Sequence, residues 1–88
     1  MKKETVRFYF ACRGRIAFIE FKEGYLALNP VGKTMLPHRI KAILQEMGWP
    51  IDRVIFVRLS EVGAKRDEFF QGEVEISPSW LRYRVISQ

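Results

Sequence analysis

Two segments in which apolar and polar residues alternate flank the dipeptide Arg13-Gly14, and this pattern strongly constrains the fold of the 88-residue chain. Successive side chains of a strand point to opposite faces, so only one parity of pairing keeps the apolar side chains together. A two-residue turn at Arg13-Gly14 satisfies this condition and places Arg7 opposite Glu20. The sequence therefore predicts an antiparallel hairpin. Its other pairs are Tyr9 with Phe18 on the polar face, and Val6, Phe8 and Phe10 with Phe21, Ile19 and Ala17 on the apolar face.

A second turn is predicted at Glu23-Gly24, because glycine supplies the positive φ that tight hairpin loops need. The residues Tyr25 to Asn29 then form a third strand, with Leu26 and Leu28 on the apolar face. The first third of the chain is thus predicted to be a three-stranded meander.

An amphipathic helix is predicted to follow the meander. The tetrapeptide at 29–32, Asn-Pro-Val-Gly, interrupts the sheet, and Thr34 is placed to help cap the helix. Gly48 suits the left-handed position after a helix end, and Pro50 prevents the helix from continuing. Between these start and stop signals, apolar residues recur with helical spacing on one face, at Leu36, Ile40, Ile43, Leu44 and Met47.

The second half of the chain is predicted to contain one central strand and a terminal hairpin. Residues 53–59 are almost wholly apolar, which is typical of a strand in the middle of a sheet. Residues 70–86 form a hairpin around Pro78-Ser79, with the pairs Ile76–Leu81, Glu75–Arg82, Val74–Tyr83 and Glu73–Arg84. The predicted fold is therefore α+β, a mainly antiparallel sheet of five or six strands with the helix Leu36 to Met47 packed on one face.

Length and composition limit the architecture. Eighty-eight residues, of which 48% are hydrophobic, predict one compact domain over 1–88. The single cysteine, Cys12, cannot form an internal disulfide, which fits a reducing compartment, and no apolar run reaches the roughly 20 residues of a membrane span. A cytoplasmic protein without membrane contact is predicted.

No catalytic or metal-binding motif is found. The run Val31-Gly32-Lys33-Thr34 resembles the end of a phosphate-binding P-loop, but Ala27 stands where that motif needs its first glycine. His38 and Cys12 alone cannot assemble a four-ligand zinc site. Glu73 and Glu75 face arginines in the predicted hairpin, which indicates an ion ladder instead of a catalytic pair. The sequence predicts a non-enzymatic protein without cofactor or metal.

The basic side chains suggest a binding function. Fifteen Lys and Arg against ten Asp and Glu give a formal net charge of +5, which favours acidic partners. A cluster of cations at a helix start, where free N–H groups already add positive charge, favours an anion, although a solvated helix face explains the same pattern. The first prediction is a nucleic-acid-binding module for DNA or RNA. Its candidate contacts are Arg13 and Arg15 at the hairpin tip and Lys33, His38, Arg39 and Lys41 near the helix start.

Three aromatic residues, Tyr9, Phe18 and Tyr25, fall on the second face of the meander. They would stack bases if that face is exposed, or form part of the core if the chain covers it. The alternative prediction is a protein-binding adaptor, oligomer subunit or inhibitor, for example a phage-type protein that blocks host machinery. In that case the same aromatic residues would anchor the partner.

Overall fold

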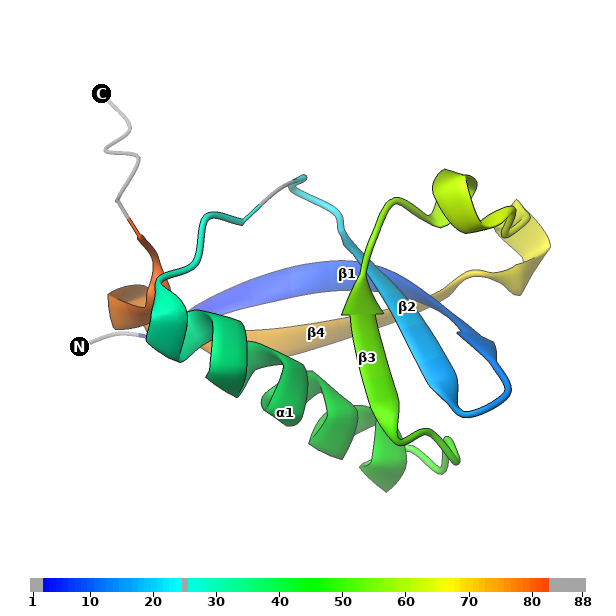
Figure 1. The fold of residues 1–88 in the computed structure, drawn as a ribbon, viewed down its shortest axis with the longest axis horizontal. Helices are drawn as coiled ribbons and strands as arrows, with labels where there is room; N and C mark the ends of the chain where they lie inside the picture. The colour runs from blue at the N-terminus through cyan, green and yellow to red at the C-terminus, as the bar shows by residue number, and fades with distance from the viewer. Residues whose placement is uncertain (1–2, 25, 83–88) are drawn as a thin grey trace.

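A four-stranded mixed sheet packs against one long helix in the computed structural model, which describes residues 3–24 and 26–82 (Figure 1). The spatial order of the strands is β3-β2-β1-β4. β1 pairs antiparallel with β2 and with β4, whereas β2 and β3 are parallel. The elements are β1 (Glu4–Arg13), β2 (Ile16–Phe21), α1 (Pro30–Glu46), β3 (Arg53–Phe56) and β4 (Phe70–Ile76).

The hairpin of β1 and β2 is present, but its register differs from the predicted one by two residues. Arg13 pairs with Ile16, so the turn residues are Gly14 and Arg15. Both common two-residue hairpin turns need a positive φ at their first central position, and Gly14 has φ +60° there. Arg13 at that position would be strained. A shift of two residues preserves the parity, so the predicted apolar face is confirmed although the predicted partners are wrong.

The predicted meander and the predicted strand count are wrong. The predicted third strand lies in the segment between β2 and α1. The strand pairing recorded there is one isolated bridge, between Leu28 and Leu81. The chain instead crosses from β2 through α1 to β3, and such a crossover makes the two strands parallel. The four residues of β3 lie at an edge of the sheet, not in its middle. The fold is α+β with four strands in the described residues.

The predicted C-terminal hairpin is also wrong where the structure describes it. Residues of β4 pair with β1, so that Glu75 lies opposite Thr5 and Glu73 opposite Arg7. β1 has ten residues, so it is long enough to pair with a strand on each side. Because one face of β1 is apolar, pairing with it also places Val74 and Ile76 of β4 in the core. After β4 the chain forms a short 3₁₀ helix, η3 (Pro78–Trp80). The predicted partners Tyr83 and Arg84 lie outside the described residues.

Helix α1 starts six residues before the predicted position. Asn29 is the N-cap, and its Oδ1 accepts a hydrogen bond from the Gly32 N–H at 2.9 Å. Thr34 is not the cap, since its hydroxyl donates to the Pro30 carbonyl one turn earlier. The predicted helix end is confirmed: Gly48 has φ +98°, and the Trp49 N–H donates to the Leu44 carbonyl at 3.0 Å.

The core lies between α1 and one face of the sheet. Leu36, Ile40 and Leu44 of α1 are fully buried, whereas Met47, predicted to share their face, is 55% exposed. At its first turn α1 approaches η3 so closely that a Cβ on Gly32 would lie 2.7 Å from the Trp80 carbonyl oxygen. The sheet residues of this core include Val6, Phe8, Phe10, Ala17, Ile19 and Phe21.

The connection between β3 and β4 covers part of the second face of the sheet. It contains the 3₁₀ helices η1 (Leu59–Val62) and η2 (Arg66–Glu68). Leu59 is fully buried, and its N–H donates to the Glu20 carboxylate at 2.7 Å. The Phe69 ring lies 6.0 Å from the Tyr9 ring, between centroids. Tyr9 and Phe18 are consequently half-buried and do not form an open aromatic surface.

Candidate functional site

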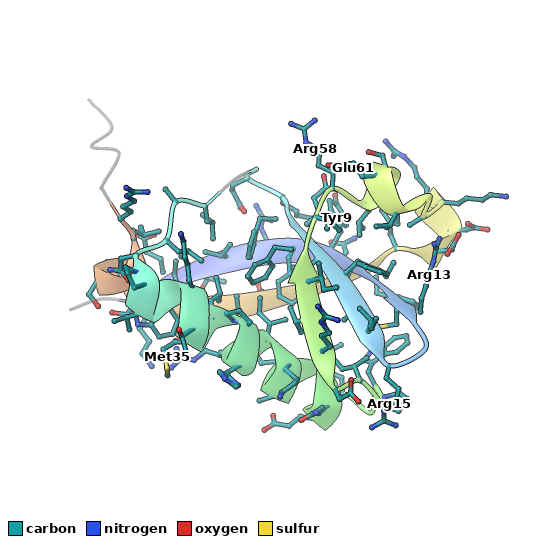
Figure 2. All side chains as sticks on the ribbon, viewed as in Figure 1. Tyr9, Arg13, Arg15, Met35, Arg58 and Glu61 are labelled. Atoms are coloured by element: carbon teal, nitrogen blue, oxygen red, sulfur yellow. The ribbon has the colours of Figure 1, made fainter. Side chains whose placement is uncertain are left out.

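The two arginines at the hairpin tip are engaged by different parts of the fold. Arg13 donates to the Val62 carbonyl at 2.6 Å and lies 3.5 Å from the Glu68 carboxylate. Arg15 forms an ion pair with Asp52 at 2.8 Å. The two side chains leave the turn in different directions (Figure 2). The hairpin tip therefore does not bring them together as one anion-binding pair.

Arg39 is separated from the other cations of α1. Its Nη1 donates to the Glu75 carbonyl at 3.0 Å, and its guanidinium lies 4.6 Å from the centroid of the Trp80 ring. These contacts join α1 to β4 and η3. Arg39 thus serves to hold the helix in place.

The remaining predicted binding residues of α1 meet at one groove. Lys33, His38 and Lys41 line a groove of about 320 Å³ between α1 and the edge strand β3, together with Arg53. We call the groove that these four residues line the basic groove. The carboxylate of Asp52 also lines it, but that group is paired with Arg15. The structure records ion pairs for other arginines and none for Lys33, Lys41 or Arg53 among the residues it describes.

A larger pocket of about 540 Å³ adjoins the basic groove. Its lining residues come from the C-terminal ends of the parallel strands β2 and β3, from Gly24, Leu26 and Leu28 in the segment that leads to α1, and from the chain after β3. Lys33 lines both the pocket and the basic groove. We call this cavity the apolar pocket, because most of its wall consists of Ile19, Phe21, Leu26, Leu28, Phe56 and Val57.

Four charged residues also line the apolar pocket. Lys33 and Arg58 are cationic, and Glu20 and Glu61 are anionic, so their formal charges balance. Arg58 and Glu61 both follow β3 (Figure 2), and the Glu61 N–H donates to the Arg58 carbonyl at 2.9 Å. One oxygen of Glu20 already accepts the Leu59 N–H. The pocket therefore offers hydrogen-bond donors and acceptors without an excess of positive charge, in contrast to the basic groove.

The predicted stacking residues lie elsewhere. Tyr9 packs on Phe69 and has the Lys22 ammonium 4.9 Å from its ring centroid. That ammonium also donates to the Gln71 side chain at 2.8 Å. Phe18 is half-buried on the face that η1 covers, and Tyr25 lies outside the described residues. The aromatic residues that line the apolar pocket are Phe21 and Phe56, and Phe56 is 36% exposed.

Sequence reasoning missed Arg53, Arg58 and Phe56 because they belong to β3 and its C-terminal extension. Their signal was the order strand, helix, strand, which is typical of a parallel crossover unit. That order places the helix beside the strand that follows it. The phosphate-loop resemblance at Gly32 has a different explanation, because the close approach of Trp80 leaves no room for a side chain.

Among the residues that the structure describes, two titratable groups have shifted pKa values, and neither lines the two cavities. A backbone N–H from Lys65 and the nearby Arg13 lower the pKa of Glu68. Burial raises the pKa of the Cys12 thiol. Within the residues that the structure describes, no three His, Cys, Asp or Glu side chains form a group that could hold a metal ion. In this same part of the chain, no helix is long and apolar enough to cross a membrane.

Comparison of the chain with protein-family models, with curated proteins and with solved structures gave no match.

Proposed function

We propose that the protein is a small, non-enzymatic nucleic-acid-binding module that holds a phosphate backbone in the basic groove. One observation carries this proposal: α1 and β3 place Lys33, His38, Lys41 and Arg53 along one groove, whose only lining carboxylate among the described residues is paired with Arg15. Phosphate contacts by lysine and arginine supply most of the affinity of such modules. Neither the hairpin-tip arginines nor Arg39 is needed for this interaction.

The test is a binding titration at several salt concentrations. Fluorescence anisotropy with labelled single-stranded RNA, single-stranded DNA and duplex DNA measures affinity at each concentration. If three cations contact phosphates, a plot of log affinity against log salt has a slope of about −2 to −3. Replacing Lys41 by Ala should reduce that slope by about 1, because one fewer counterion is released. Absence of any complex at low salt overturns the proposal.

A matched control separates the groove from net charge. The double variant Lys41→Glu and Arg53→Glu should weaken binding more than tenfold, because each reversal replaces an attraction to phosphate with a repulsion. The control is the double variant Lys65→Glu and Arg66→Glu, which changes the net charge by the same amount. Both residues are exposed at η2, in the connection that covers the other face of the sheet. This control variant should weaken binding far less. Equal losses from the groove and control positions would show that only overall charge matters.

A second candidate function, protein binding, is favoured by an exposed aromatic patch at the other end of α1. Phe70 is 44% exposed, and its ring lies 4.7 Å from the ring of the half-buried Trp49. Met47, exposed beside the helix end, precedes Trp49 by two residues. Light scattering tests whether copies of the chain associate through this patch, since Phe70→Ser should then abolish the oligomer and leave nucleic-acid affinity unchanged.

A further inference from the structure

We infer that the apolar pocket accepts one unpaired base of a nucleic-acid strand whose backbone lies in the basic groove. The inference rests on the proposed function and specifies its ligand as single-stranded. A base within a duplex is stacked and paired, so it cannot enter a pocket of this kind without leaving the helix.

Continuity of the two cavities is the first argument. Lys33 lines both, so a phosphate held at Lys33 lies at the boundary between them. The basic groove has cationic side chains and one neutralised carboxylate, whereas the charges at the apolar pocket balance. This division matches a nucleotide, whose phosphate is anionic and whose base is neutral. An ordinary anion would gain no net attraction there, because Glu20 and Glu61 offset Lys33 and Arg58.

The wall of the apolar pocket is the second argument. The rings of Phe21 and Phe56 lie 5.2 Å apart between centroids, at 44° to each other, and Phe56 is partly exposed. Bases stack on such rings in most proteins that bind single strands. The volume of about 540 Å³ falls within the range of small-ligand sites and admits a base with its sugar.

The polar groups of the apolar pocket are the third argument. Arg58 supplies N–H donors, and Glu61 supplies carboxylate acceptors. The Watson–Crick edge of every unpaired base presents both hydrogen-bond donors and acceptors, so these two residues can bond a base that stacks on Phe56. An apolar peptide side chain would form no hydrogen bond with either residue.

The experiment compares two labelled single strands of equal length by anisotropy, one with bases and one with abasic sites. Wild-type protein should bind the strand with bases roughly 5- to 100-fold more tightly, as expected for loss of one stacked base. Phe56→Ala should remove this difference and leave the salt dependence unchanged. Met35→Ala is the control, since Met35 is 41% exposed on the outer side of α1 (Figure 2) and should preserve the difference.

The outcomes distinguish the inference from the proposed function. Equal binding of both strands by wild-type protein overturns the base pocket and leaves phosphate binding intact, whereas failure to bind either strand at low salt overturns the proposed function. Duplex DNA that competes as well as the single strand also overturns the base pocket. If circular dichroism shows that Phe56→Ala is unfolded, Phe56→Leu tests stacking instead, because leucine fills the space but has no ring on which a base can stack. A strand that carries the fluorescent base 2-aminopurine gives a further readout. Quenching of its fluorescence by the wild-type protein, and loss of this quenching with Phe56→Leu, supports the inference.

Discussion

At Gly32, helix α1 comes into close contact with η3. A Cβ at this position would lie 2.7 Å from the Trp80 carbonyl oxygen and 2.8 Å from the Trp80 Cβ. Neither atom belongs to the end of a movable side chain. We therefore expect Gly32→Ala to lower the free energy of unfolding by about 1–3 kcal/mol, as overpacking does. Urea unfolding followed by far-ultraviolet circular dichroism measures this change.

The sign of the Gly32→Ala effect is informative. Alanine favours a helix over glycine by about 1 kcal/mol when no contact opposes it. A stabilised Gly32→Ala variant would thus contradict the close approach of the two elements. Val31→Ala is the control, because Val31 is exposed in the same turn, and its substitution should change stability by less than about 0.5 kcal/mol.

Cys12 provides a prediction on pH. Burial raises the pKa of its thiol, so less thiolate is present in the folded protein than in the unfolded chain at pH 8. Alkylation by iodoacetamide should accordingly be slower in buffer than in urea. The folded state holds the thiol proton more tightly, so this contribution to stability is complete below the ordinary thiol pKa and is lost as the pH rises. Cys12→Ala should remove that alkaline loss; equal alkylation rates would contradict the burial.

At the scale of elements, η1 is expected to stabilise the second face of the sheet. Leu59 is fully buried there, and Ala11 of β1 is 1% exposed. Leu59→Ala should lower the free energy of unfolding by about 2–5 kcal/mol, the range for removing a buried leucine side chain. Ser60→Ala, at the exposed next position, is the control for urea unfolding. Similar small effects at both positions would mean that η1 does not pack on the sheet.

The sequence predicted faces better than partners. Alternation fixes the side of the sheet on which a residue lies, and this survived the two-residue shift at Gly14. It does not identify the neighbouring strand. Glu73 does lie opposite an arginine, but this is Arg7 of β1, because the long first strand offers the same match as the predicted hairpin.

The candidate site was predictable only in part, for the same reason. Helical spacing brings His38 near Lys41, three residues later, whatever the rest of the fold does. Arg53 and Phe56 join them only because β3 returns parallel to β2. The apolar residues Leu26 and Leu28 suit a strand and a pocket wall equally well, so their pattern did not reveal that they line a cavity.

At the scale of the whole molecule, the two tryptophans lie at opposite ends of α1 and test whether the chain unfolds as one domain. Trp80 is buried beside the first turn, and Trp49 packs on Phe10 just after the last. Small single domains unfold cooperatively. We expect the fluorescence and circular-dichroism transitions to coincide in Trp49→Phe and likewise in Trp80→Phe. A fluorescence transition that precedes the loss of helix in either variant would indicate independent unfolding of one end.

The hydrogen bond from Arg39 to β4 has a consequence for aggregation. The Lys22 N–H donates to the Arg7 carbonyl, so the odd-numbered residues of β1 direct their backbone N–H and C=O groups toward β2. Glu73 and Glu75 of β4 lie opposite odd-numbered residues of β1. Their backbone groups therefore point away from β1, to the outer edge of the sheet. That open edge could template the addition of another strand. The Arg39 guanidinium already donates a hydrogen bond to the Glu75 carbonyl on this edge. The exposed carboxylates of Glu73 and Glu75 lie along the same edge. A second molecule adding here would have to break this bond and bring like charges together, so fibril growth from β4 is opposed by the helix itself.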